Sequence, residues 1–157
     1  RDSVLPESFI IGVRISPEIE RIGIALDDSI KLCSILTDEG IDFIHLSCWN
    51  AFKGSISYRN NSKTLTEWFA TSLNNPPSII STGKVWSHKD AQHLLNQGAD
   101  LIGVGRAAIG HPNWASQVEN INYNPAKPPF SVTELREAML SDVFIDYMRN
   151  WEGFVCD

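Results

Sequence analysis

Short, continuous apolar segments alternate along this chain with longer segments in which apolar residues recur at helical spacing. The apolar segments are rich in β-branched residues and cover residues 9–15, 43–46, 79–80 and 101–104. Segments of this kind are typical of strands that are buried on both faces of a parallel sheet. The pattern therefore predicts four strands, each followed by a helix.

The predicted helices have recognisable starts and stops. Apolar residues recur at helical spacing over residues 27–39, and Gly40 then suits a helix C-terminus. Thr64 suits the N-cap of a helix over residues 65–73, which Asn-Asn-Pro-Pro at 74–77 ends.

The third predicted helix begins after Ser87 and ends at Gly98, and a fourth begins at Arg106. A strand–helix unit is thus repeated four times, which implies parallel strands joined by right-handed crossovers. Four such units are half of a (β/α)8 barrel, so we expect an α/β fold of TIM-barrel type that contains only the last four βα units, equivalent to strands 5–8. We expect the N-terminal half-barrel to have been lost, to come from another chain, or to be replaced by a second copy.

The composition changes near residue 120. Asn and Pro are frequent in residues 120–129, which predicts an extended linker, and residues 133–150 predict a helix that is re-capped near Ser141. We therefore expect residues 1–119 to form the half-barrel and residues 120–157 to form a linker and C-terminal helical extension of the same domain.

Charge and cysteine content exclude several classes of protein. The net charge of the 157 residues is -6, without a cluster of Lys and Arg, which argues against a nucleic-acid-binding surface. No apolar run approaches the roughly 20 residues of a membrane span. The three cysteines lack metal-ligand spacing, so we expect no metal and reduced thiols in a cytoplasmic protein.

Candidate binding residues stand at the ends of the predicted strands. Gly83 and Lys84 follow the third strand, and Gly105 and Arg106 follow the fourth. Glycine lets backbone N–H groups approach an anion, and a guanidinium fits phosphate oxygens bidentately. These ends predict a phosphate site of the kind found after strands 7 and 8 of a barrel. Arg14, in the first strand, suits either an anionic or electron-rich partner at the rim or a salt bridge to a neighbouring strand.

Four motifs occur in a fixed order, namely GVRISP at 12–17, GIDFIHLSCWN at 40–50, STGKVWSHKDA at 81–91 and GADLIGVGRAAIGHPNW at 98–114. Together they resemble the Old Yellow Enzyme family of flavin-dependent oxidoreductases, and more narrowly its bacterial NADH:flavin oxidoreductase branch. The resemblance covers the barrel part, and the C-terminal tail is similar to that of some members. It implies the C-terminal half of an enzyme that passes hydride from NADH or NADPH through FMN to an activated alkene or a similar electrophile.

The resemblance also implies roles for single residues. Arg14 matches the family arginine beside the flavin pyrimidine ring, where a positive charge favours the reduced flavin. Gly83 and Lys84 match the loop whose backbone amides touch the FMN phosphate, although many relatives have a small or aliphatic residue in place of Lys84. Gly105 and Arg106 match the pair that holds the phosphate by close approach and by charge.

Other residues receive weaker assignments. Ser47 and Trp49 fall where the family places variable substrate-side residues, and Trp49 also suits ordinary rim packing. We expect His45 to be a hydrogen-bonded core histidine, and His88 and His93 to face solvent on an outer helix. The family's substrate-anchoring pair and proton-donating tyrosine belong to the first half of the barrel, so no catalytic residue is assigned here.

Two other interpretations stay open. The chain alone can be an inactive fragment or a half-barrel module whose open sheet edges serve assembly, with a partner or as a homo-oligomer. It can also belong to a non-flavin barrel enzyme of a phosphorylated metabolite, since the phosphate site fits that class equally. Arg14 separates the two enzyme classes, because an arginine beside the ring is a requirement of a flavin and not of a phosphate.

Overall fold

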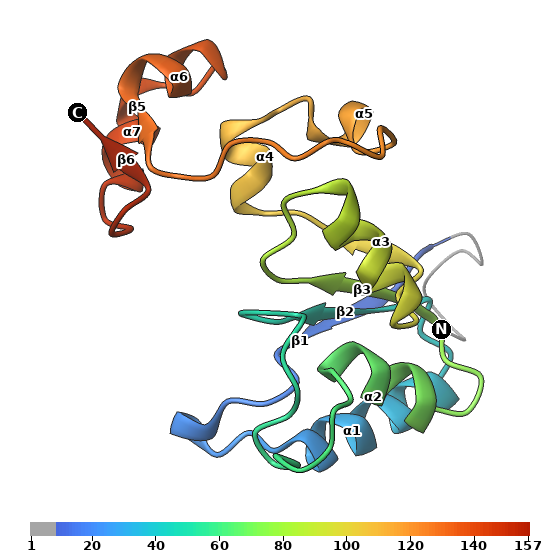
Figure 1. Ribbon diagram of the computed structural model, residues 1–157. Coiled ribbons are helices and arrows are strands. Elements are labelled where there is room, and N and C mark those ends of the chain that lie inside the picture. Colours follow the sequence, from blue (N-terminus) through green and yellow to red (C-terminus); the bar gives the residue numbers. More distant parts are fainter. Residues whose placement is uncertain (1–8) are drawn as a thin grey trace. The chain divides into compact units, whose positions relative to one another are not determined.

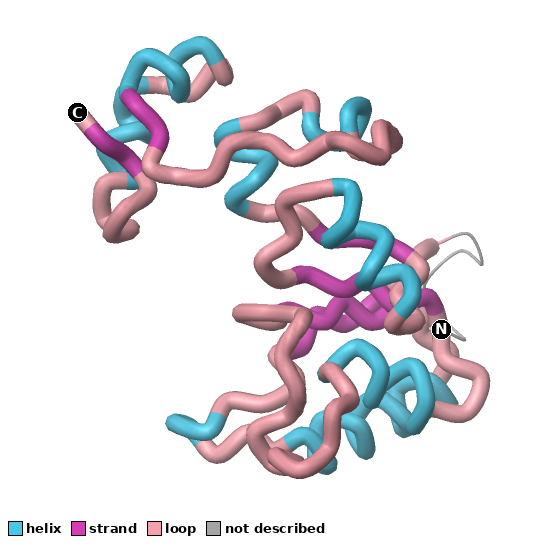
Figure 2. Tube along the Cα trace, viewed as in Figure 1, coloured by secondary structure: helices cyan, strands magenta, loops and turns pink. Residues whose placement is uncertain are grey.

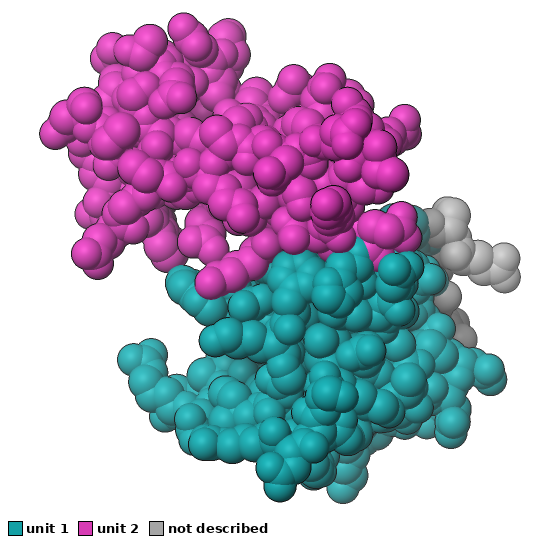
Figure 3. Space-filling model, in the orientation of Figure 1, with its two compact units in different colours: residues 1–83, 93–103 teal, residues 84–92, 104–157 magenta. Residues whose placement is uncertain are grey.

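The chain forms two compact units (Figure 3). The computed structural model describes residues 9–157. Unit 1 contains the described residues up to Gly83 together with residues 93–103, and unit 2 contains residues 84–92 and 104–157.

Unit 1 is built around a four-stranded parallel sheet (Figures 1 and 2). Its neighbouring strands follow chain order as β1 (Gly12–Ile15), β2 (Phe43–Ser47), β3 (Ser78–Thr82) and β4 (Leu101–Gly103). Every neighbouring pair is parallel. The predicted α/β class with parallel strands is therefore confirmed, whereas closure into a barrel stays a prediction.

Helices occupy the connections, in the order η1 (Glu20–Ile22), α1 (Leu26–Asp38), α2 (Leu65–Ser72), α3 (His88–Asn96), α4 (Arg106–Gly110) and α5 (Trp114–Gln117). The Thr64 N-cap is confirmed: its side chain accepts a hydrogen bond from the Glu67 N–H at 3.3 Å, and the Glu67 carboxylate accepts one from the Thr64 N–H at 2.7 Å. This reciprocal capping box satisfies two N–H groups at the start of α2.

The first strand is shorter than its apolar run predicted. Residues 9–11 lie outside β1, and the Ile11 N–H donates to the Asp42 carboxylate at 2.7 Å. The Asp42 carboxylate thus accepts the hydrogen bond that the Ile11 N–H would donate to a neighbouring strand if β1 were longer.

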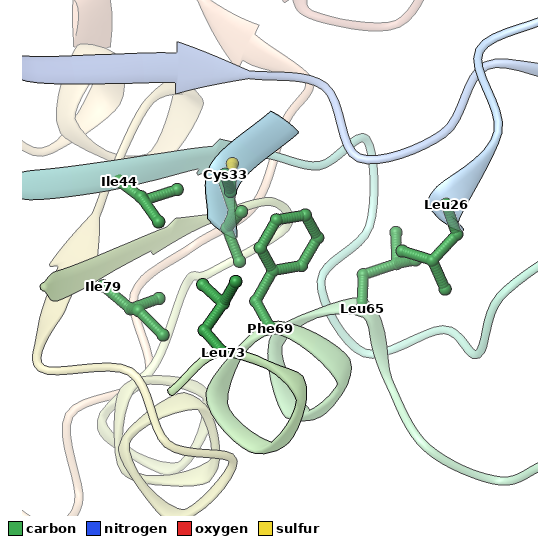
Figure 4. Packing of buried hydrophobic residues seen from close by; sticks show 8 residues of the cluster. Leu26, Cys33, Ile44, Leu65, Phe69, Leu73 and Ile79 are labelled. Carbon is green, nitrogen blue, oxygen red and sulfur yellow. The ribbon is translucent and has the colours of Figure 1, made fainter. Parts of the chain in front are cut away.

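The two faces of the sheet differ in chemistry. Ile44, Leu46 and Ile79 are almost fully buried on one face, where they pack with residues of α1 and α2. Figure 4 shows Ile44 and Ile79 directed toward Phe69 and Leu73, with Cys33 of α1 above them. Because side chains alternate along a strand, the residues between them face the other way.

Unit 2 contains a small core around a second pair of strands. Parallel strands β5 (Phe130–Ser131) and β6 (Val155–Cys156) flank helices α6 (Val132–Glu137) and α7 (Asp142–Met148). Their buried residues are Phe130, Leu135, Ile145, Met148 and Phe154.

The re-capping near Ser141 is confirmed, since the Ser141 side chain accepts from the Phe144 N–H at 3.3 Å. β5 and β6 were not predicted from the sequence, because two-residue strands are too short to show a period.

One histidine prediction was wrong. His88 is half-buried rather than solvent-facing. Its ring Nδ1 hydrogen-bonds with the Val118 carbonyl at 2.7 Å, and its backbone N–H donates to the Tyr123 carbonyl at 3.0 Å. His93 is exposed as expected, with its ring 5.3 Å from that of Phe52. Within residues 9–157, no helix has the length and apolar character that a membrane crossing requires.

We expect Phe69→Ala to lower the free energy of unfolding by about 3–5 kcal/mol, because it leaves a cavity among fully buried neighbours. Chemical denaturation measures this loss. Leu32→Ala is the matched control, since Leu32 on α1 is 46% exposed and its loss should cost no more than about 0.5–1 kcal/mol. Equal losses for the two variants would contradict the described core.

Candidate functional site

Polar side chains gather on the sheet face that points away from α1 and α2, near the carboxyl ends of the strands. The strand register places Arg14 opposite His45 and Ser47 opposite Thr82. The Arg14 guanidinium donates to the Ser47 hydroxyl at 2.6 Å, and His45 Nε2 hydrogen-bonds with the Thr82 hydroxyl at 2.7 Å. The four side chains therefore form two cross-strand pairs on one face.

A hydroxyl, not a carboxylate, holds Arg14. Among residues 9–157, no ion pair joins the Arg14 guanidinium to an acidic side chain. This finding disfavours the salt-bridge interpretation that the sequence left open. A guanidinium held by one neutral partner keeps its charge and most of its donors for another group.

The surroundings of His45 favour its neutral imidazole. Burial, and after it the positive charge of Arg14, lower the pKa of this imidazole from its ordinary value of 6.5. The expected hydrogen bond is confirmed, but His45 lies half-buried on the polar face and not in the core beneath α1 and α2. Arg14 is therefore the cation of this face.

Glycines fit tightly around the polar pairs. A Cβ on Gly103 would overlap the Thr82 hydroxyl and approach His45 Nε2 to 3.4 Å. Gly83 has a φ of +148°, and a Cβ there would lie 2.5 Å from the Cys48 carbonyl oxygen. Packing against the segment after β2 is thus sufficient reason for glycine at position 83.

The backbone at Gly105, after β4, is less crowded than the backbone at Gly83. A Cβ on Gly105 would meet no heavy atom within 4 Å, so the described protein leaves open space beside this backbone. Arg106 follows as the first residue of α4, and Lys84 is exposed with a φ of +59°, a left-handed conformation that the sequence did not reveal. The phosphate-binding roles of these residues and of Gly83 stay predictions.

A cavity of about 610 Å³ lies in unit 1 between the segments that follow β1 and β2. Ser47 and Trp49, the two candidate pocket residues, both line it. Its volume falls within the range of about 300–1,000 Å³ that small-molecule sites occupy. The remaining lining was not predicted from the sequence, because its residues belong to irregular loops; it includes Pro17, Glu18, Lys53 and Ile56.

The thiols near this region are poor nucleophiles. The three cysteines are free, and Cys48 lines the cavity. Burial, and then the negative charge of Glu18, raise the pKa of Cys48 to about 12, and burial raises the pKa of Cys33 to about 11. Because the thiolate is the reactive form, these residues do not suit nucleophilic catalysis at neutral pH.

Comparison with known proteins relates the chain to one class of enzyme. No family model matches it. It is 34% identical to NADH:acrylate oxidoreductase of Vibrio harveyi and 36% identical to NADH:fumarate oxidoreductase of Klebsiella pneumoniae (strain 342), in each case over 117 residues. It is 23% identical over 149 residues to the probable NADH-dependent flavin oxidoreductase YqiG of Bacillus subtilis (strain 168).

The chain is thus similar to parts of three oxidoreductases whose names contain NADH, and the name of the third also contains a flavin. The first two matches cover 71% of this chain but only 12% of each relative, and the third covers 94% of this chain and 40% of the relative. The chain thus spans a minor part of each of these proteins.

We expect Arg14→Ala to raise the pKa of His45, because the charge that disfavours the imidazolium is removed. Burial remains, so the pKa should stay below 6.5. An NMR titration of the imidazole protons measures it, with Arg21→Ala as the control for loss of a remote cation. An unchanged His45 titration in Arg14→Ala would contradict the described proximity of the two side chains.

We expect Cys48 to resist iodoacetamide at pH 8 in the folded protein. With a pKa of about 12, its thiolate fraction is about one in ten thousand, against about a quarter for an ordinary thiol. Peptide mass spectrometry after timed alkylation measures the rate, and the denatured protein provides the control in which all three cysteines react. Rapid labelling of folded Cys48 would argue against its burial.

Proposed function

We propose that this chain supplies the FMN-binding part of an NADH-dependent flavin oxidoreductase of the Old Yellow Enzyme type. The observation that carries the proposal is the state of Arg14, a charged guanidinium held by Ser47 at the carboxyl end of a parallel sheet. Ligands of α/β proteins bind at that end of the strands. The names of the three relatives support NADH as a reactant, and the name of the third supports a flavin.

The residues present fit FMN in two respects. Arg14 offers a fixed positive charge for the pyrimidine edge of the ring, and neutral His45 beside it adds no second charge. The open space at Gly105 suits close approach of a phosphate, with Arg106 beside it as its charged partner. Bound FMN would supply hydride acceptance from NADH and hydride donation to the second substrate.

Within this proposal, Ser47 orients the arginine. The 2.6 Å hydrogen bond to Ser47 favours one orientation of the guanidinium, so we propose that the charge is oriented before a cofactor binds. Preorganised charge stabilises developing negative charge without a cost of rearrangement at the time of reaction.

The cavity beside Ser47 is proposed to receive the electron acceptor, an activated alkene or a similar electrophile. Trp49 lines this cavity and is 74% exposed, which makes it available to an apolar substrate. Acrylate and fumarate, which the names of two relatives contain, are activated alkenes, but the chain covers 12% of those proteins. We therefore propose the class of acceptor only.

A further part of the protein is proposed to complete the site. The polar face of the sheet is half-buried or exposed, and Leu101 on the edge strand β4 is 55% exposed. Parallel sheets are normally covered on both faces. We propose that an N-terminal half-barrel, from the same protein, a partner or a second copy, covers this face and carries the proton donor, and that the protein acts in the cytoplasm.

We expect Arg106→Ala to weaken FMN binding by the full-length protein about tenfold or more, since a charged hydrogen bond to phosphate is lost. Riboflavin lacks the phosphate, so its affinity should change little. Fluorescence titration with both flavins measures the two dissociation constants, and Arg21→Ala is the control. A proportional loss for both flavins would contradict a phosphate role for Arg106, and the absence of any flavin binding by the unaltered protein would contradict the proposed function.

A further inference from the structure

One carboxylate ties the segment after β2 to the segment after β1. Glu18 Oε1 accepts a hydrogen bond from the Ile56 N–H at 2.6 Å, and Oε2 accepts one from the Ser55 hydroxyl at 2.8 Å. The Ser57 N–H at 3.4 Å and the Ser57 hydroxyl at 3.3 Å add longer contacts to Oε2. A single side chain thus binds three consecutive residues that lie 37 to 39 positions away in the sequence.

The remaining ties between the two segments are weaker or lie farther along the chain. The Tyr58 hydroxyl donates to the Asp27 carboxylate at 2.7 Å, and Arg59 lies 3.7 Å from Glu20 in an exposed ion pair. Exposed ion pairs contribute little to stability. Glu18 is therefore the main tie at residues 55–57.

These contacts bear directly on the cavity. Glu18 and Ile56 both line it, and the Ile56 N–H forms the shortest of the hydrogen bonds to Glu18. Both segments run below the sheet in Figure 1, on the side of α1 and α2, and they continue from the ends of β1 and β2. The position of the Ile56 side chain in the cavity wall thus depends on the Glu18 carboxylate.

We propose that Glu18 is a positioning residue that fixes residues 55–57 and thereby shapes the cavity that receives the electron acceptor. The reference to an acceptor rests on the proposed function, whereas the fixing of residues 55–57 does not. A carboxylate is suited to this task because each of its two oxygens accepts from a different part of the segment. No proton transfer is assigned to Glu18.

Hydrogen–deuterium exchange tests the positioning without reference to flavin. Glu18→Ala removes both acceptor oxygens, and Glu18→Gln keeps one of them, so amide exchange at residues 55–57 should rise about tenfold or more in the first and less in the second. Glu20→Ala is the matched control, because it removes the same charge from the same cavity wall without touching that segment's backbone. Unchanged exchange in Glu18→Ala would overturn the proposal, whatever the protein binds.

Steady-state and single-turnover kinetics of the full-length protein test the effect on the cavity, with cyclohex-2-enone as the acceptor probe. The KM for cyclohexenone should rise about tenfold or more in Glu18→Ala and less in Glu18→Gln. The rate at which NADH bleaches the bound flavin should stay within twofold of the unaltered protein. Increased exchange with an unchanged KM would overturn the role in shaping the site. If NADH fails to bleach a flavin in the unaltered protein, the proposed function is contradicted. The exchange result would still decide whether Glu18 positions residues 55–57.

Discussion

Side chains alternate between the two faces of the sheet along each of three parallel strands. Both the stability and the chemistry of unit 1 depend on this alternation. Val13, Ile44 and Ile79 point into the core formed with α1 and α2. Arg14 follows Val13 and His45 follows Ile44, so these two side chains must point to the opposite face. A shift of one residue in register would bury a guanidinium in an apolar core and expose the core residues. The apolar packing that holds the sheet together therefore also places the cation where a ligand can reach it.

The polar face is organised by neutral partners. Ser47 accepts from Arg14, and Thr82 pairs with His45, while glycine at position 103 leaves room for the Thr82 hydroxyl. Burial and the neighbouring guanidinium both lower the pKa of His45, which leaves Arg14 as the charged group. An oriented single charge of this kind suits a ligand whose electron density changes during a reaction, which is the physical basis for proposing a flavin there.

Much of unit 1 could be predicted from local patterns. Continuous apolar runs located the strands, and Thr64 marked the start of α2 because its capping box is made within four residues. The features that were missed depend on distant partners. Asp42 shortens the first strand by binding the Ile11 N–H, Val118 and Tyr123 bind His88, and Glu18 reaches residues 55–57. Local hydrophobic patterns do not indicate contacts of this kind. The sequence therefore indicated Ser47 and Trp49 as candidate pocket residues but did not show which loop residues complete the cavity.

We propose that the polar face of this sheet belongs to a flavin site that accepts electrons from NADH. The most direct test is the anaerobic addition of NADH to the FMN-loaded full-length protein, followed by the visible absorbance of the flavin. We expect bleaching that is much slower in Arg14→Ala than in Arg21→Ala, because of these two residues only Arg14 carries its charge on the polar face. Bound FMN that NADH fails to bleach, or equal rates in the two variants, would contradict it.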